Sequence, residues 1–166
     1  MSDNPDPPKG ELIISGDRNL AIRKSGLVKR GLDLIHESRK RHVEILVVDD
    51  EPLFTKLVSR LLTDEGYEVD TAGDGIDALE KIRGKKYNLL LTDITMPGMS
   101  GFELYESAIK IAPYLANKTI ITSSNFDSDD RKEFLAKYKL LYIVTPFIPK
   151  HLVSEVNAVL NSESKK

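Results

Sequence analysis

The chain has 166 residues, of which 40% are hydrophobic and 30% charged, and this balance indicates one folded domain with a tail rather than a disordered protein. It contains no cysteine, which excludes disulfide bonds, thiolate metal sites and a cysteine nucleophile together. The net charge of −2 is unevenly divided, because residues 1–43 carry +3 and residues 44–166 carry −5. We therefore predict an N-terminal extension over 1–43 and a folded domain over 44–166. The acidic folded domain gives no support to nucleic-acid binding.

The sequence also bears on where the protein resides. No apolar run approaches the roughly 20 residues that a membrane-spanning helix needs. The N-terminal segment MSDNPDPPKG lacks the charged and then apolar pattern of a signal peptide. We therefore expect a cytoplasmic protein that does not contact a membrane.

The N-terminal extension is expected to combine a disordered tail with one amphipathic helix. Residues 1–10 contain three prolines and little apolar surface, which is typical of disorder. Residues 20–40 are predicted to be helical, because apolar residues recur there at helical spacing, at Leu27, Val28, Leu32 and Ile35. The apolar face of this helix would pack on the folded domain, which we favour, or contact a partner or a second copy. The basic run at 38–42 is interpreted as a solvated linker.

From residue 44 onward, five apolar segments alternate with five amphipathic ones. The predicted strands lie at 45–48, 67–72, 89–93, 120–121 and 140–144. A helix is predicted after each strand, and Pro52, Asp74, Ser128 and Pro149 are expected near the starts of four of them. The residues predicted to face the core are, helix by helix, Leu53, Phe54, Leu57, Val58, Leu61 and Leu62; Ile76, Leu79 and Ile82; Phe102, Leu104, Tyr105, Ala108 and Ile109; Phe134, Leu135 and Tyr138; and Leu152, Val153, Val156, Val159 and Leu160.

This alternation predicts the α/β fold class, with a doubly wound five-stranded parallel sheet and helices on both faces. Right-handed crossovers favour the flavodoxin-like strand order 2-1-3-4-5. The order places segment 67–72 at one edge, in agreement with its alternating apolar and polar residues. It places segment 140–144 at the other edge, although that segment is apolar throughout. Because exposed apolar edge strands are a liability, we expect a partner or a second copy to cover it.

Acidic and hydroxyl side chains follow the predicted strands at the edge where ligands bind in such sheets. Asp49 and Asp50 follow the first strand, Asp93 ends the third, and Ser123 follows the fourth. Carboxylates that converge on one small pocket repel one another, so they must be partly protonated or hold a cation. The donors are hard oxygens without His or Cys, which makes Mg²⁺ the expected cation. The alternative is that each acid only caps a helix, as Asp50 could before Pro52.

Four segments match a known family in order and at family-like spacings. They are ILVVDDEP at 45–52, LLLTDITMPGMSG at 89–101, TIITSS at 119–124 and LYIVTPF at 141–147. The chain thereby resembles the receiver domain of two-component response regulators over nearly all of residues 44–161. The specific feature is the combination of a double acid, an aspartate heading the MPGMSG loop, and a hydroxyl thirty residues later.

The resemblance implies a role for each acid of the predicted pocket. Asp93 would receive a phosphoryl group from a histidine kinase or a phosphotransfer protein. Mg²⁺ would be bound directly by Asp50, through water by Asp49, and also by Asp93 and the backbone carbonyl of Thr95. Such a domain is not an enzyme, because it signals through contacts with a downstream protein.

The resemblance also implies how the signal would be formed. Ser123 is similar to the switch hydroxyl that turns toward the phosphoryl group, and Tyr142 to the aromatic residue that swings inward behind it. Thr95 and Asn125 match the positions that tune hydrolysis. The contact surface is predicted to be the face made by strand five and its flanking helices, which would bind a downstream target or a second copy.

One residue departs from the family pattern. Receivers usually carry a lysine just before the Pro-Phe that follows strand five, whereas this chain has Thr145 before Pro146 and Phe147. Lys150 lies five residues further on, at the start of a predicted helix, and is not an obvious substitute. We expect phosphorylation at Asp93 to proceed, but with weaker coupling to the switch residues. The resemblance also implies a cis peptide bond before Pro146.

Two other functions compete with a phospho-accepting receiver. A pseudo-receiver would use the same fold as a protein-binding module without phosphorylation, and Thr145 favours this alternative. A phosphohydrolase with an aspartyl nucleophile would carry a second acid two residues after Asp93. That position is Thr95, which disfavours the enzyme.

Overall fold

The computed structural model describes residues 28–34 and 43–162. The chain divides into two units, Met1–Arg39 and Lys40–Lys166. In the first unit, residues 28–34 form a helix, inside the range predicted to be helical. The remainder of that range, the tail over 1–10 and the basic run at 38–42 lie outside the described residues. In the part of the chain that is described, no helix is long and apolar enough to cross a membrane.

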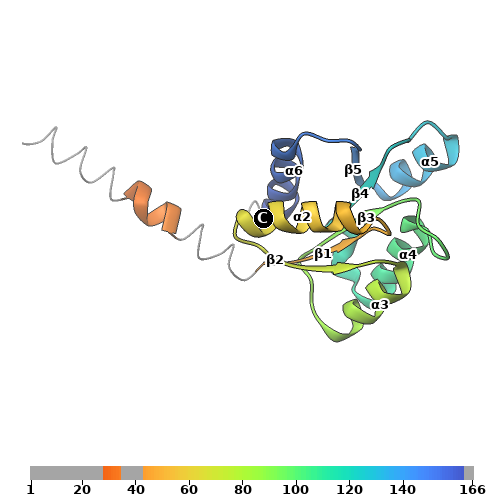
Figure 1. The fold of residues 1–166 in the computed structure, drawn as a ribbon, viewed down its shortest axis with the longest axis horizontal. Helices are drawn as coiled ribbons and strands as arrows, with labels where there is room; N and C mark the ends of the chain where they lie inside the picture. The colour runs from red at the N-terminus through yellow and green to blue at the C-terminus, as the bar shows by residue number, and fades with distance from the viewer. Residues whose placement is uncertain (1–27, 35–42, 163–166) are drawn as a thin grey trace, which may run out of the picture. The chain divides into compact units, whose positions relative to one another are not determined.

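The second unit is built on one parallel sheet of five strands, in the order β2-β1-β3-β4-β5 (Figure 1). The predicted fold class and strand order are therefore confirmed. The strands are β1 (Glu44–Val48), β2 (Glu68–Ala72), β3 (Leu89–Asp93), β4 (Thr119–Ser123) and β5 (Leu141–Val144). The central strands β1, β3 and β4 are buried along almost their whole length, as continuous apolar runs in a parallel sheet should be.

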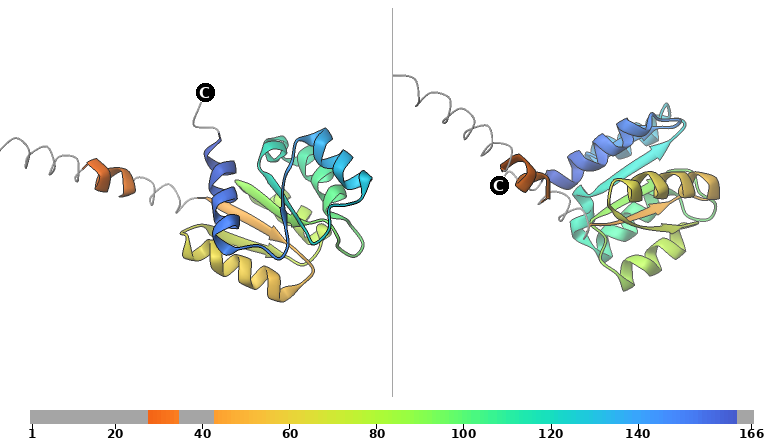
Figure 2. Two further views of the ribbon diagram at one scale, coloured as in Figure 1. Left: turned by 90° about the horizontal axis from the view of Figure 1, so that it is seen from above. Right: turned by 60° about the vertical axis from the view of Figure 1, so that its left-hand side comes forward.

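Helices cover both faces of the sheet (Figure 2). They are α2 (Pro52–Asp64), α3 (Gly75–Gly84), α4 (Gly101–Ile111), α5 (Asp129–Tyr138) and α6 (Pro149–Asn161), with a short 3₁₀ helix η1 (Pro113–Asn117) that was not predicted. Alternate residues of β1 separate the two cores. Ile45 and Val47 pack with α2 and α6, whereas Leu46 and Val48 pack with α3 and α4. The helix α5 packs with α4 through Leu135.

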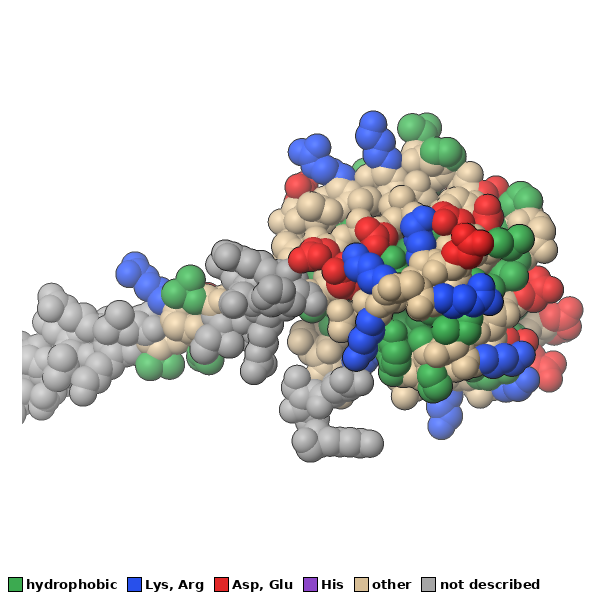
Figure 3. All heavy atoms as spheres, turned by 90° about the horizontal axis from the view of Figure 1, so that it is seen from below, with side chains coloured by type: hydrophobic (Ala, Val, Ile, Leu, Met, Phe, Trp, Pro, Cys, Tyr) green, Lys and Arg blue, Asp and Glu red, His purple; other side chains and the backbone are tan. Residues whose placement is uncertain are grey.

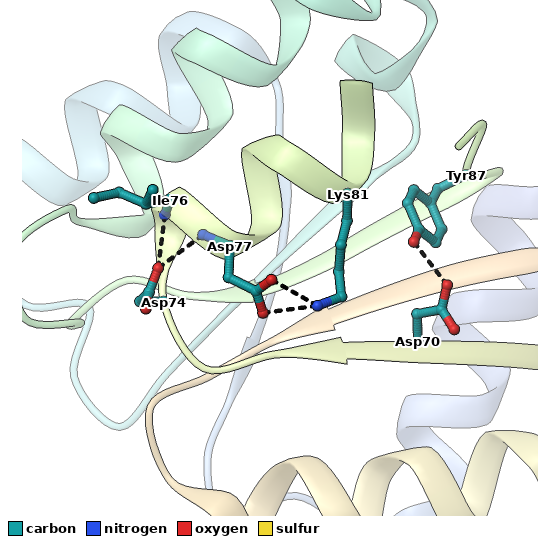
Figure 4. Close-up of polar contacts among 6 residues, drawn as sticks. All are labelled: Asp70, Asp74, Ile76, Asp77, Lys81 and Tyr87. Atoms are coloured by element: carbon teal, nitrogen blue, oxygen red, sulfur yellow. Dashed lines mark hydrogen bonds and ion pairs between the residues drawn. The ribbon is translucent and has the colours of Figure 1, made fainter. Parts of the chain in front are cut away.

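Polar contacts fix α3 and the segments around it (Figure 4). The Asp74 carboxylate accepts hydrogen bonds of 2.9 Å from the backbone amides of Ile76 and Asp77, which confirms the predicted cap. Asp77 in turn accepts from the ammonium group of Lys81 one helical turn later, at 2.6 and 2.8 Å. The Asp74 carboxylate thus satisfies two of the free amides at the start of α3, so the helix begins at a defined residue.

Three apolar residues predicted to face the core are exposed instead: Leu53 by 76%, Leu57 by 61% and Ile76 by 65%. In α2 the packed residues include Phe54 and Val58. A helix turns about 100° per residue, so Leu53 and Leu57 fall beside that row rather than on it. Ile76 follows the buried Gly75 in α3, so its side chain points about 100° away from the buried face of the helix.

The surface charge of the folded domain is mixed. On the face drawn in Figure 3, acidic and basic side chains are interspersed around apolar ones. That face therefore lacks the continuous basic stripe that nucleic-acid-binding surfaces present.

Candidate functional site

The sheet brings the residues predicted from the strand ends to one edge. Asp49 follows β1, and its amide extends the ladder to the carbonyl of Ala72 at 3.1 Å. Asp93 ends β3 and lies in register with Thr122. Ser123 ends β4, and its carbonyl accepts a 2.9 Å hydrogen bond from the amide of Thr145, directly after β5. The carboxyl ends of four neighbouring strands thus meet where parallel sheets bind ligands.

Asp49 is the most buried acid of this cluster, with 9% of its surface exposed. The pKa of its carboxyl is raised from 3.8 to about 6, chiefly by burial and also by the negative charges of Asp93 and Asp50. A 2.8 Å hydrogen bond from the Glu51 amide to Asp49 Oδ1 opposes this rise. The three carboxylates are therefore close enough to repel one another, as the sequence predicted.

Asp93 is half-buried at the end of β3. Burial raises the pKa of its carboxyl, the amides of Thr95 and Ile94 lower it, and the charge of Asp50 raises it. The Thr95 amide donates to Asp93 Oδ2 at 2.8 Å, so one carboxylate oxygen is held in place. Asp50 is exposed beside this pair. The cap of α2 is Glu51, without a side-chain capping bond, so the interpretation of Asp50 as a helix cap is wrong.

The carboxylates of Asp49, Asp50 and Asp93 can be compared with the ligands that a divalent cation requires. Among the described residues, no three acidic or imidazole side chains form a complete metal cage. Mg²⁺ does not need one, because it keeps several waters and takes one or two carboxylates. The pKa of Asp49 and that of Asp93 are both raised, by burial first and also by the charge of Asp50, and a divalent cation would relieve this repulsion. The residues present therefore fit a magnesium ion that keeps part of its water.

Glycine brings α4 up against the end of β3. A Cβ atom on Gly101 would lie 2.0 Å from the carbonyl oxygen of Asp93, a distance that no side chain permits. The Gly101 amide donates to the carbonyl of Ile94 at 2.8 Å. Ser100 and Glu103 form a capping box that starts α4 at this point. The loop that carries Asp93 is thus fixed at both ends.

The hydroxyl of Ser123 is tied into its own loop. Ser123 is almost fully buried, and its Oγ donates to the carbonyl of Asn125 at 3.0 Å. The amide of Asn125 donates back to this oxygen at 3.2 Å. In this conformation the hydroxyl is engaged with Asn125 rather than with Asp93.

Arg131 is a site residue that the sequence reasoning missed. Its Nη2 donates to Thr95 Oγ1 at 3.2 Å, and its Nη1 donates to Ser123 Oγ at 3.5 Å and to the carbonyl of Asn125. Its positive charge lowers the pKa of Asp93, against the effect of burial. The capping residue Ser128 locates Arg131 in the first turn of α5, but nothing in the sequence indicates its contacts with Thr95 and Ser123.

The remaining predicted residues lie in β5 and in the segment that follows it. Tyr142 is 48% exposed, and its ring lies against Phe126 with centroids 4.5 Å apart. Thr145 is half-buried, and its peptide bond to Pro146 is cis, as expected. Lys150 is exposed in the first turn of α6.

A five-stranded sheet in this order, with paired acids after β1 and an aspartate ending β3, defines a flavodoxin-like domain of the receiver type. The family model of the response regulator receiver domain matches residues 45–157. The chain therefore belongs to the response regulator receiver family.

Individual relatives agree with this assignment. Response regulator ArlR of Staphylococcus aureus is 32% identical over 123 residues, which cover 74% of this chain and 55% of ArlR, so the chain spans about half the length of that relative. A CheY-like receiver domain protein from Methanospirillum hungatei is 32% identical with a TM-score of 0.68, over 74% of this chain and 97% of the other. Response regulator TrrA of Thermotoga maritima, solved in complex with Mg(2+)-BeF, is 34% identical with a TM-score of 0.61, over 70% and 98%.

Proposed function

We propose that this domain accepts a phosphoryl group on Asp93 with the help of Mg²⁺ and signals through protein contacts. The observation that carries the proposal is the gathering of Asp49, Asp50 and Asp93 at one sheet edge, where burial and mutual repulsion raise the pKa of Asp49 to about 6. A pocket of this kind is costly to keep unless it serves a cation or a proton. Similarity to TrrA, which was solved with Mg(2+)-BeF, supports the same cation.

The donor would be the phosphohistidine of a histidine kinase or of a phosphotransfer protein. A carboxylate oxygen of Asp93 attacks phosphorus, the P–N bond breaks, and its electron pair returns to the imidazole, which takes up a proton. The product is an aspartyl phosphate. Mg²⁺ held by Asp50, Asp93 and the backbone carbonyl of Thr95, and through water by Asp49, would offset charge on the phosphoryl group during transfer.

The protein's own part in this step is mainly positioning. The 2.8 Å hydrogen bond from the Thr95 amide to Asp93 Oδ2 orients the carboxyl group before a donor arrives. After transfer, the Ser123 hydroxyl exchanges its bond to Asn125 for one to a phosphoryl oxygen. Tyr142 then moves inward from its exposed position. The side chains of Thr95 and Asn125 influence access of water to the aspartyl phosphate.

The signalling surface in this proposal is the face around β5. Tyr142 and Val144 are 48% and 52% exposed, which is unusual for a strand of apolar residues. A groove of about 650 Å³ runs beside them, lined in part by Phe126, Leu135 and Leu140. A downstream protein or a second copy would bind here. Replacing Tyr142 by alanine should weaken that contact and leave phosphorylation intact; unchanged binding of every partner would remove the assignment.

The pseudo-receiver remains the second candidate, and the neutral Thr145 is the observation that favours it. In that case the domain would bind its partner without modification, and Asp93 would be dispensable for binding. The two functions make opposite predictions for a small phosphodonor.

The deciding experiment is incubation with acetyl phosphate and Mg²⁺, followed by intact mass measurement. The wild type should gain one phosphoryl mass, and chelation of the metal should prevent the gain. Asp93→Asn should gain nothing, whereas the control Asp64→Asn, at the exposed end of α2, should behave as the wild type. An unmodified wild type at saturating donor and metal would favour the pseudo-receiver.

A further inference from the structure

The phosphoryl site lacks a cation from β5. Thr145 offers a neutral hydroxyl, and its amide is already bonded to the carbonyl of Ser123 at 2.9 Å. Pro146 has no amide hydrogen to donate. Lys150 lies exposed on α6. A phosphorylated aspartate would therefore receive no positive charge from this strand or the turn after it.

A different element places a cation between the two loops that flank Asp93. The Arg131 guanidinium comes from the first turn of α5 and touches Thr95 in the loop after β3 and Asn125 in the loop after β4. Thr95 is also the residue whose amide holds Asp93 Oδ2. Through Nη1 the same guanidinium lies 3.5 Å from the Ser123 hydroxyl. Arg131 thus contacts both the loop that orients Asp93 and the switch hydroxyl.

The charge of Arg131 is not neutralised by a neighbouring acid. Within residues 28–34 and 43–162, no ion pair of Arg131 is found, even with Asp127, Asp129 or Asp130, the acids closest to it in sequence. Its three acceptors are two hydroxyls and a carbonyl, all of them neutral. Half burial of the side chain limits screening by water. A guanidinium that forms no ion pair is well placed to bind the anion that phosphorylation would create on Asp93.

We propose that Arg131 supplies the positive charge to the phosphoryl group on Asp93 that Thr145 cannot supply. This inference rests on the proposed function. The planar guanidinium offers parallel N–H groups that match two phosphoryl oxygens. On phosphorylation, Arg131 exchanges its bonds to Asn125 and Thr95 for bonds to the phosphoryl group. The Ser123 hydroxyl, released from the same loop, can then approach the same group.

A purely structural role would explain the same contacts, because Arg131 joins two loops. The two roles differ in what a lysine at position 145 should do. If Arg131 supplies charge, Thr145→Lys adds more affinity to Arg131→Gln than to the wild type, where the charge is already present. If Arg131 only holds the loops together, Thr145→Lys adds the same affinity to both proteins.

The test uses the full chain with beryllofluoride and Mg²⁺ as a phosphoryl mimic, followed by NMR titration. Arg131→Gln should weaken beryllofluoride binding by about tenfold or more, the effect of one lost charge-assisted hydrogen bond. Lys132→Gln removes the same charge from the next residue of α5, which is exposed, and should change little. Thr145→Lys should raise the affinity of Arg131→Gln by clearly more than it raises that of the wild type. Arg131→Gln should also bind Mg²⁺ alone more tightly, because a cation near the site is gone.

Each result separates the two proposals. If the wild type binds no beryllofluoride and takes no phosphoryl group from acetyl phosphate, the proposed function fails. If the wild type binds and Arg131→Gln binds equally well, the function stands and the role of Arg131 falls. Loss of binding in Arg131→Gln, with an equal gain from Thr145→Lys in the wild type and in Arg131→Gln, would make Arg131 a structural contact between the loops and overturn the inference. Should Arg131→Gln not fold, the wild type still decides, since an unshifted Arg131 side-chain resonance at saturating beryllofluoride overturns the inference.

Discussion

Replacing Asp49 by asparagine should stabilise the metal-free protein at pH 8. The buried carboxylate is ionised at that pH, and its raised pKa means that this ionisation lowers the free energy of unfolding. Asparagine keeps an oxygen that can accept the 2.8 Å hydrogen bond from the Glu51 amide, but it carries no charge. The substitution therefore removes repulsion with Asp93 and Asp50 and preserves the local contact.

The magnitude follows from the pKa. The rise from 3.8 to about 6 is roughly two units, which at about 1.36 kcal/mol per unit gives at most about 3 kcal/mol. The folded pKa lies above the unfolded value, so the folded state holds the proton more tightly. This group's penalty is thus absent below pH 3.8, grows as the pH rises to about 6, and is constant above it.

Urea denaturation of the metal-free wild type and Asp49→Asn, at intervals from pH 4 to pH 8, measures the effect. The free energies of unfolding should be similar at low pH and diverge toward pH 8, with the variant more stable. Asp64→Asn, a change at an exposed aspartate, should show no such divergence. A variant that is no more stable than the wild type at pH 8 would refute the argument that Asp49 is held at an energetic cost.

Two further substitutions test how the site and the fold are supported. Gly101→Ala should lower the free energy of unfolding by about 1–3 kcal/mol or more, because its Cβ would lie 2.0 Å from the Asp93 carbonyl oxygen. The same substitution should slow modification by acetyl phosphate. Gly84→Ala is the control, because Gly84 has open space around it. Lys118→Met should cost about 1.5–3 kcal/mol in chemical denaturation, because the ammonium group of this buried lysine bonds the carbonyls of the last turn of α6, at 2.6 and 3.4 Å. The exposed Lys56→Met should cost little, and equal losses would contradict the explanation.

The sheet could be predicted from the sequence because its signals are local. A continuous apolar run such as 45–48 needs cover on both faces, and alternation with helices leaves few topologies. The acids at positions 49, 50 and 93 could be placed for the same reason, since strand ends in a parallel sheet share one edge. The buried faces of the helices were predicted less accurately. Leu53 and Leu57 extend the apolar stripe of α2 beyond the part that packs on the sheet, so both are exposed.

Arg131 could not be found in the same way. Its role depends on the path of the loop over 124–128, which turns the first turn of α5 back toward the ends of β3 and β4. No periodicity or motif encodes that path. The resemblance to receivers identifies Thr145 as the position where the family's cation is missing, but it says nothing of a cation on α5.

Thr145 alone predicts a weakly held phosphorylated state, whereas Arg131 predicts a well-held one. The contacts of Arg131 favour the second expectation. Taken alone, a threonine at the end of β5 leaves the pocket more negative by one charge and the phosphorylated state less well held. The guanidinium of Arg131 would restore that charge from α5, at a position where it already contacts the Ser123 hydroxyl and Thr95. Charge near the phosphoryl group would then match that of a lysine-bearing receiver, while its source lies on α5.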